Sequence, residues 1–456
     1  MTGEARFPKT APHVLMLTNH GVHEWKVTPG LTDTGGQNVY VNELTGALVD
    51  HGYRVTVVNR GGYPHPVTGI PQVGIAEHPS GMARILYIED GTPAFVRKED
   101  MNDHVPALVA DLFSRLERDG VGYDLMISHY WDAGKVGAAL KDLTGSDAPH
   151  LWVPHSLGTL KKTNTDQAAW HGLRIDERIE HEKELLERID GAVATSTTIR
   201  ETLERDYAHT APFFLPPCVD TGRYHPRRHD ECAGVWDLLA AHSTRTATEI
   251  RSRRIITEVS RTDVTKRKDV LLHAMARVRE QIPGVLLVLT LDERAGKAYA
   301  DAVALIRDLG LESDVIVLGS VWDHLPCIYA ISDVYCTPSV MEGFGMSAQE
   351  AAASGVPVVA SDLVPFVREY LLGPGPLWQP LNGNLGRGIL VGDGAIVVPA
   401  DDIDGFVRAL ATVLADDHKR TAMGRSAFAI TVPYFTWSRR TEDLLETLGL
   451  RSAHAP

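Results

Sequence analysis

The stretch that decides the fold is VYCTPSVMEGFGMSAQEAAASGVPVVA, residues 334–360. It opens with a short apolar run at Val334–Thr337, passes through a loop into a helix-forming segment, and closes with a second apolar run at Val356–Ala360. Strand–loop–helix–strand units of this kind, repeated along a chain, are typical of parallel α/β sheets. This stretch therefore predicts an α/β protein.

The same alternation extends through the rest of the chain. In the first half, a helix is expected at Val39–Asp50, and strands at His13–Leu17, Arg54–Val58, Leu125–Ser128 and, as the last of that half, Ala192–Thr195. The pattern then restarts, with a helix expected at Val270–Gln281 and strands at Arg254–Val259, Val285–Thr290 and Asp314–Leu318. Two successive α/β halves predict two doubly wound domains facing one cleft, with ligands at the carboxyl ends of the strands.

The joint between the halves is expected near Leu215–Pro226, where the pair Pro216–Pro217 interrupts regular structure. Further on, Asp230–Glu249 is expected to be an irregular or helical insertion, and Gly373–Gly394 a surface loop rich in glycine and proline. The resulting domain prediction is residues 1–218, residues 219–433, and a C-terminal segment, 434–456, that packs back on the first domain.

Composition and charge argue against several classes of protein. The net charge of −14 argues against a nucleic-acid surface, which needs clustered basic residues, so any phosphate-bearing ligand is expected in a local basic pocket. The N-terminal segment lacks the basic and apolar regions of a secretory signal, and no apolar run approaches the roughly 20 residues of a membrane span. The four cysteines show no C-x-x-C spacing and are expected to be free thiols. We therefore expect a cytoplasmic protein without integral membrane association.

Residues 342–350, EGFGMSAQE, place two carboxylates around the start of a predicted helix. Free backbone N–H groups at a helix start bind anions such as a diphosphate. They can also donate hydrogen bonds to sugar hydroxyls. Glu350 lies about two turns into the helix, where it can accept hydrogen bonds from a ribose diol. The alternative is an exposed helix start with a solvated glutamate, but the surrounding strands favour a ligand site.

Residues 260–268, SRTDVTKRK, follow the expected strand at 254–259 directly. Cations at the carboxyl end of a strand face the ligand side of a doubly wound sheet. Arg261 is predicted to clamp a diphosphate by forked hydrogen bonds, and Lys266 to act as a point charge. For Arg267 and Lys268 we favour the alternative of a solvated basic loop.

A glycine pair follows the first expected strand, in residues 32–37, TDTGGQ. Consecutive glycines let the backbone come close to a ligand and offer N–H donors at a helix start. The spacing differs from the G-x-G-x-x-G of a dinucleotide site, which argues against the alternative of a dinucleotide-dependent oxidoreductase.

Two further loops carry polar side chains. Residues 154–162, PHSLGTLKK, place a histidine, a hydroxyl and two lysines after an expected strand, which suits a polar or phosphorylated ligand. Residues 128–132, SHYWD, end another expected strand and are expected to line the same cavity. The alternatives are a structural histidine in the first loop and ordinary aromatic packing in the second.

Taken together, these segments resemble glycosyltransferase family 4, whose fold, GT-B, consists of two facing Rossmann-like domains. The resemblance runs from PHVLML at residue 12 through FTW at residues 435–437. It is closest to the branch of sucrose-phosphate synthases and mannosylfructose-phosphate synthases. The segments that carry this likeness are DTGGQNVYVNEL, SHYWDAG, PHSLGTLKK, SRTDVTK and MEGFGMSAQEAAASG.

The resemblance implies that the first domain binds the acceptor and the second binds the nucleotide sugar. It makes four residues catalytic: His155, beside the transferring sugar, Arg261 and Lys266, on the diphosphate, and Glu342, on the sugar hydroxyls. The implied donor contacts are Gly35, Gly36, Gly343, Phe344, Gly345, Met346 and, on the ribose, Glu350. The implied acceptor contacts are Gln37, His129, Tyr130, Ser156 and, for an acceptor phosphate, Lys98 and Lys161.

The activity that the resemblance implies is a retaining transfer of a hexosyl group from a UDP-, GDP- or ADP-sugar, with no metal or other cofactor. The small hydrophilic acceptor is expected to be a sugar or sugar phosphate. In this mechanism cations and the helix start stabilise the departing diphosphate, whose oxygen takes the acceptor proton. The alternatives are a natural-product or aminocyclitol acceptor, a GT-B nucleotide-sugar epimerase or phosphorylase, and a sugar-binding protein without activity.

Overall fold

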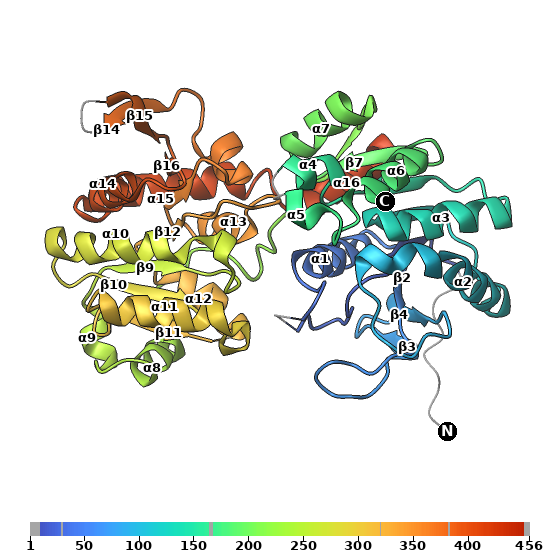
Figure 1. Cartoon of the computed structure of the whole chain (residues 1–456), viewed down its shortest axis with the longest axis horizontal. Coiled ribbons are helices and arrows are strands. Elements are labelled where there is room, and N and C mark those ends of the chain that lie inside the picture. Colours follow the sequence, from blue (N-terminus) through green and yellow to red (C-terminus); the bar gives the residue numbers. More distant parts are fainter. Residues whose placement is uncertain (1–9, 29–30, 164–166, 320, 382–383, 451–456) are drawn as a thin grey trace. The chain divides into compact units, whose positions relative to one another are not determined.

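The computed structural model describes residues 10–28, 31–163, 167–319, 321–381 and 384–450, which form two compact units (Figure 1). Unit 1 comprises the chain up to Pro217 together with the residues from Trp437 onward, and unit 2 comprises Cys218–Thr436. The chain passes between the units after residues 217 and 436, whereas the sequence-based division lies after residues 218 and 433.

The described part of unit 1 contains an eight-stranded sheet in the order β3-β4-β2-β1-β5-β6-β7-β8. All neighbours are parallel except β3 and β4. The strands are β1 (His13–Leu17), β2 (Arg54–Arg60), β3 (Gly74–Glu77), β4 (Ala83–Ile88), β5 (Leu125–His129), β6 (His150–Val153), β7 (Gly191–Ala194) and β8 (Phe213–Phe214). The prediction that the strand near residue 192 is the last of this half is wrong. The two residues of β8 follow it, and they are too few to give a periodic signal in the sequence.

The helices of unit 1 show ordinary start and stop signals. In α2, Pro106 occupies the first turn, where a missing N–H costs nothing, and Gly120 ends the helix in the left-handed conformation. The C-terminal helix α16 packs on α1, with the ring of Trp437 4.9 Å from that of Tyr40. The elements are α1 (Gly36–Asp50), η1 (Lys98–His104), α2 (Val105–Asp119), α3 (Tyr130–Thr144), α4 (Gly158–Thr163), α5 (Gln167–Trp170), α6 (Ile175–Leu186), α7 (Thr197–Tyr207) and α16 (Trp437–Thr447).

The described part of unit 2 contains a second eight-stranded sheet, in the order β11-β10-β9-β12-β13-β16-β15-β14. The first six strands of this order are parallel neighbours, and β15 and β14 are antiparallel additions. The strands are β9 (Ile255–Glu258), β10 (Leu286–Thr290), β11 (Val315–Leu318), β12 (Val334–Thr337), β13 (Val358–Ser361), β14 (Leu377–Leu381), β15 (Asn384–Val391) and β16 (Ala395–Val398).

The prediction of a surface loop at Gly373–Gly394 is wrong, because β14 and β15 form a hairpin there. Its proline and glycine content is compatible with a strand at the edge of a sheet. Pro380 lies in β14, the outermost strand, where a residue without an N–H need not break the ladder.

Helices cover both faces of the unit 2 sheet, which defines a doubly wound unit. In β10, Leu286 and Val288 belong to one apolar core, while Leu287 and Leu289 belong to the other. The first core receives residues of α8 (Ala233–Ala241), α12 (Leu325–Ala330), α13 (Met346–Ala353) and α15 (Asp417–Thr431). The second receives residues of α10 (Lys268–Gln281), α11 (Lys297–Asp308) and α14 (Ile403–Leu414). The expected insertion at 230–249 is thus helical, as α8 and the start of α9 (Ala247–Arg251).

The strand orders locate the ligand side of each sheet. Along the sheet of unit 1 the chain order reverses between β1 and β5, and along that of unit 2 between β9 and β12. Ligands of doubly wound sheets bind at the carboxyl ends of such strand pairs. The glycine pair ends the loop after β1, and SHYWD spans the end of β5 and the start of α3. In unit 2, SRTDVTK follows β9, and EGFGMSAQE lies between β12 and β13, so the fold brings these motifs of each unit to its own switch point.

Candidate functional site

In unit 2, the structure joins the two charged motifs directly. Lys266 ends the short helix η2 (Val264–Lys266) that follows β9, and its side chain is almost buried. Its Nζ lies 2.5 Å from Oε1 of Glu342 and donates to the carbonyl oxygen of Met341 at 3.3 Å. Arg261 is exposed, and within the described residues its guanidinium makes no hydrogen bond or ion pair. Unit 2 therefore places one tethered cation and one exposed cation at the end of β9.

The segment Gly343–Met346 leads into helix α13, which begins at Met346. Gly345 has φ of 108°, and a Cβ there would lie 2.5 Å from the Val364 side chain, so this turn requires glycine. Phe344 is buried against Phe366, which leaves its backbone as the part that can meet a donor. The tight turn presents the helix start of α13 at the same strand ends as Lys266.

Glu350 lies inside α13 and is partly exposed. Its Oε2 accepts a hydrogen bond from the Tyr329 hydroxyl at 2.9 Å, so the carboxylate is oriented before any ligand binds. Burial and the carboxylate together raise the pKa of Tyr329 well above its ordinary value, which keeps the phenol a hydrogen-bond donor. The predicted ribose contact is therefore a fixed acceptor group.

In unit 1, His129 at the end of β5 contacts His155 in the loop after β6. Nδ1 of His129 lies 2.9 Å from Nε2 of His155, and the edge of the Tyr40 ring meets both imidazoles. Burial lowers the pKa of His155 to about 3 and that of His129 well below its ordinary value, so both rings are neutral. His129 has no exposed surface and supports His155 in this structure, and its contact with an acceptor stays a prediction.

The glycine pair of unit 1 stands at the start of α1, which begins at Gly36. The Gly35 N–H donates to Oδ1 of Asn38 at 2.9 Å, so it is engaged within the protein. Gly36, by contrast, is exposed. Gln37 donates to the hydroxyl of Thr18 at 3.0 Å, which ties the helix start to the end of β1. The pair therefore forms part of an ordered turn at the switch point.

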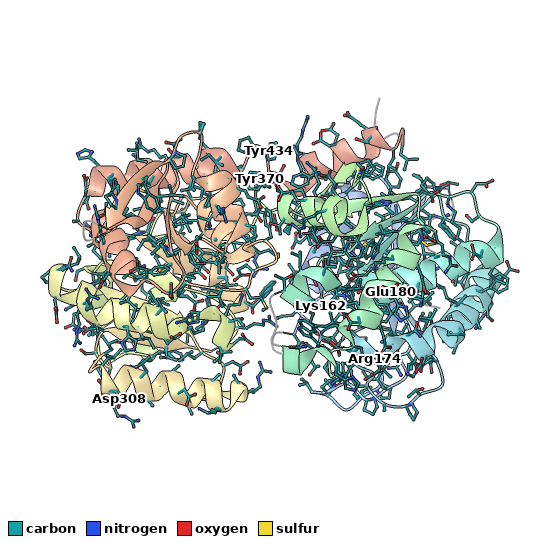
Figure 2. The ribbon with its side chains drawn as sticks, turned by 45° about the horizontal axis from the view of Figure 1, so that its top comes forward. Lys162, Arg174, Glu180, Asp308, Tyr370 and Tyr434 are labelled. Atoms are coloured by element: carbon teal, nitrogen blue, oxygen red, sulfur yellow. The ribbon has the colours of Figure 1, made fainter. Side chains whose placement is uncertain are left out.

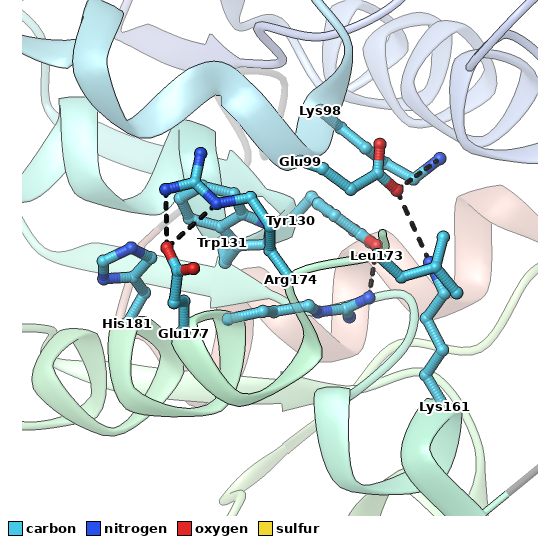
Figure 3. Close-up of a pocket in the computed structure, with 10 residues that line it drawn as sticks. Lys98, Glu99, Tyr130, Trp131, Lys161, Leu173, Arg174, Glu177 and His181 are labelled. Atoms are coloured by element: carbon cyan, nitrogen blue, oxygen red, sulfur yellow. Dashed lines mark hydrogen bonds and ion pairs between the residues drawn. The ribbon is translucent and has the colours of Figure 1, made fainter. Parts of the chain in front are cut away.

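A charged pocket lies beside these loops in unit 1 (Figure 3). Lys98 comes from η1, Lys161 from α4, and Arg178 from α6, so segments far apart in the sequence supply its cations. Lys162 and Arg174 come from the same α4–α6 region (Figure 2). Nζ of Lys162 donates to Asp176 at 2.6 Å. The lining residues are Lys98, Glu99, Tyr130, Trp131, Lys161, Leu173, Arg174, Glu177, Arg178 and His181.

Each cation of this pocket faces a carboxylate. Lys98 forms an ion pair with Asp33 of the glycine loop, and Lys161 Nζ lies 3.6 Å from Glu99 Oε1. Arg174 pairs with Glu177 at 2.5 Å, and Arg178 with Glu182 at 2.7 Å. An anion that enters the pocket must therefore compete with carboxylates for its cations.

The two lysines differ in how strongly they are neutralised. Burial, with the charges of Arg178 and Lys98 nearby, lowers the pKa of Lys161. Burial also disfavours the charge on Lys98, but the ion pair with Asp33 outweighs it and raises the pKa of Lys98. Lys161 is therefore the cation that gains most from a bound anion.

The sequence analysis missed two cations of this pocket, Arg174 and Arg178, and Arg178 has the more extensive contacts. It is almost buried, stacks over the Tyr130 ring at 4.4 Å and donates to the Tyr130 hydroxyl. It also donates to the carbonyl and hydroxyl oxygens of Ser156 at 2.6 and 3.0 Å. In the sequence, Arg178 and Glu182 look like an ordinary surface pair four residues apart on a helix, which hides their role.

The described residues offer neither a metal site nor a membrane span. Among them, no group of three or more His, Cys, Asp or Glu side chains is placed to hold a metal ion. None of the helices in that part of the chain is long and apolar enough to cross a membrane. None of the four cysteines forms a disulfide bond, as expected; three are buried and Cys327 is partly exposed.

Models of two protein families match the chain. Residues 34–223 match "Glycosyltransferase Family 4", and residues 244–429 match "Glycosyl transferases group 1". The D-inositol 3-phosphate glycosyltransferase of Kineococcus radiotolerans is 30% identical, with 92% of this chain and 91% of that protein covered. The mannosylfructose-phosphate synthase of Agrobacterium fabrum is 29% identical, with 77% of this chain and 76% of that protein covered.

Solved structures show the same fold. The sucrose-phosphate synthase of Thermosynechococcus elongatus superposes with a TM-score of 0.76 at 23% identity, covering 96% of this chain and 98% of that one. The two units thus have the GT-B fold, as the sequence predicted, and the family models and relatives make the chain a glycosyltransferase. The chain belongs to glycosyltransferase family 4, and its resemblance to the sucrose-phosphate and mannosylfructose-phosphate synthase branch is confirmed.

Proposed function

We propose that this glycosyltransferase moves a hexosyl group, with retention and without a metal, from a nucleotide sugar to a phosphorylated sugar or polyol. The observation that carries the proposal is the pocket of unit 1, in which Lys98, Lys161, Arg174 and Arg178 meet. Arginine forks and lysine point charges together suit a phosphate group, which carries close to two negative charges near neutral pH.

The surroundings of the pocket favour a sugar phosphate over a free phosphate. Arg178 holds Ser156 through two hydrogen bonds, and Ser156 follows His155, which is predicted to lie beside the transferring sugar. A phosphate bound at the cations would thus leave the rest of the acceptor near His155. A solved relative with this fold, an α,α-trehalose-phosphate synthase from Burkholderia xenovorans (TM-score 0.61, 15% identity, covering 96% of this chain and 100% of that one), was crystallised with glucose-6-phosphate.

The strand ends of unit 2 supply the donor side of the proposal. Departure of a nucleoside diphosphate places negative charge where Lys266, Arg261 and the start of α13 lie, and fixed positive groups stabilise that charge as it develops. These groups replace the charge that a metal ion would supply. In this structure Glu342 neutralises Lys266, and Glu342 is also the predicted partner of the donor sugar hydroxyls.

Nucleoside diphosphate release tests the proposal. Wild-type protein is incubated in EDTA with UDP-, GDP- and ADP-hexoses, in turn, and with matched pairs of free and phosphorylated acceptors. We expect release with one donor and only with phosphorylated acceptors, and a product whose anomeric configuration matches the donor. A clear preference for unphosphorylated polyols, natural products or aminocyclitols would overturn the acceptor class, and loss of activity in EDTA would overturn metal independence.

A further inference from the structure

His20 and Asp132 form a buried imidazole–carboxylate pair that has no role in the reaction proposed above. His20 lies in the loop after β1, and Asp132 lies in the first turn of α3. Nδ1 of His20 lies 2.9 Å from Oδ1 of Asp132, and the two side chains are 6% and 0% exposed. A carboxylate at Nδ1 holds the proton on that nitrogen when the ring is neutral, which leaves the lone pair of Nε2 for another partner.

The pair leaves hydrogen-bonding capacity unused. Within the described part of the chain, Nε2 of His20 has no hydrogen-bond partner, and Oδ2 of Asp132 is buried without one. The neighbouring Asn19 is 1% exposed, and its side-chain nitrogen and oxygen are also buried without a hydrogen-bond partner. Buried polar atoms without hydrogen-bond partners destabilise a folded protein, so a purely structural polar pair is a poor explanation.

The position of His20 connects it to the predicted acceptor site. Its ring meets the ring of Tyr130 edge-on at 4.7 Å, and Tyr130 lines the charged pocket. His20 therefore lies beside Tyr130, a residue that lines the pocket of the cations proposed for the phosphate.

We propose that Nε2 of His20 accepts a hydrogen bond from an acceptor hydroxyl that is not the one glycosylated, and that Asp132 is the positioning residue that fixes the imidazole for this contact. The inference rests on the proposed function. With the phosphate held by the cations and a second hydroxyl held by His20, the acceptor is fixed at two points, and this selects which hydroxyl faces the donor. His20 exchanges no proton in this step and is unchanged by it.

The test combines His20→Ala and His20→Gln with a series of acceptors, each lacking one hydroxyl. In the wild type, removing the hydroxyl that contacts His20 should lower kcat/KM about tenfold, the typical effect of one lost hydrogen bond. In His20→Ala the normal acceptor should lose about as much, mostly in KM, and removal of that hydroxyl should then cost nothing further. His20→Gln, which keeps an acceptor oxygen, should recover part of the loss.

Asp132→Asn should reproduce the His20→Ala pattern, because an amide no longer holds the proton on Nδ1. Asp142→Asn, an exposed aspartate later in α3, is the matched control and should leave all values unchanged. Equal losses for every deoxy acceptor in the His20 variants would overturn the His20 assignment and leave the proposed function standing. Wild-type protein that transfers to no phosphorylated acceptor would overturn the proposed function and the His20 inference with it.

Discussion

The two sites of this protein are built in opposite ways. In unit 2, the predicted donor residues come from two short motifs that follow adjacent strands, and one ion pair, Lys266 with Glu342, joins them. In unit 1, the charged pocket draws on η1, α3, α4 and α6, and each of its cations is matched by a carboxylate. The compact site of unit 2 therefore depends on a few residues, whereas the dispersed site of unit 1 shares its positive charge among several side chains.

The largest expected contrast between the units is their stability in acid. Burial lowers the pKa of His13, His23 and His150 to about 4 and that of His155 to about 3, and all four lie in unit 1. Because their pKa values in the folded protein lie below 6.5, the unfolded chain binds more protons between about pH 4 and 6.5. Stability is therefore fully present above that window and falls as the pH is lowered through it, by up to about 1.4 kcal/mol per pH unit for each histidine.

Hydrogen–deuterium exchange, corrected for the intrinsic effect of pH, checks this expectation. Peptides from β5 and β6 of unit 1 should lose protection between pH 7 and pH 5 by much more than peptides from β9 and β10 of unit 2. Equal losses in the two units would show that the buried histidines of unit 1 do not govern acid stability.

The next largest effect is expected at Lys266, because the compact site has little redundancy. Lys266→Ala removes the tethered cation proposed to stabilise the departing diphosphate, and kcat should fall roughly 10²–10³-fold. Lys297→Ala, which removes a lysine that is 86% exposed and paired only along its own helix, is the control and should retain full turnover. A Lys266→Ala enzyme within a few-fold of wild type would place the catalytic charge elsewhere.

Lys161→Ala probes the dispersed site, where other cations remain. A lost hydrogen bond to a charged group costs about 1.5–3 kcal/mol, so KM for a phosphorylated acceptor should rise about 10- to 100-fold while kcat changes little. Lys162→Ala alters the adjacent lysine, which bonds to Asp176, and should leave KM unchanged. If both variants raise KM equally, the increase comes from the loss of a positive charge in this region and not from the loss of a contact in the pocket.

The smallest effect is expected at Glu350, which is predicted to contact only the ribose. Glu350→Gln should weaken the affinity for the preferred nucleoside diphosphate about tenfold, as measured by calorimetry, because a carboxylate that accepts from the diol is replaced by an amide. The thermal shift caused by that nucleotide should shrink in parallel. Glu293→Gln, at an exposed position of unit 2, serves as the control. An unchanged affinity would remove Glu350 from the donor site.

Much of the fold could be predicted from the sequence, and the exceptions have physical reasons. Strands such as β1 and β12 appear as buried apolar runs, whose pattern is local. The strand β8 was missed because two residues carry no period, and the β14–β15 hairpin because glycine and proline usually signal loops. Both errors fall at or near a sheet edge, where pairing depends on neighbours distant in sequence.

The residues of the candidate sites divide in the same way. Lys266, Glu342 and Glu350 stand in motifs whose residue types and order are recognisable without a fold. Arg178 and His20 stand in no such motif, because their roles come from contacts with Ser156 and Asp132, far along the chain.

By itself, the sequence determined the α/β class, the family, and the charged motifs that follow β9 and β12. These properties are local, since strand patterns, glycine turns and helix starts depend on a few consecutive residues. Only the tertiary structure decided which cations share a pocket, which carboxylate neutralises each of them, and that His129 supports His155. These properties depend on residues tens of positions apart, such as Asp33 and Lys98, which meet only when parallel strands align their carboxyl ends.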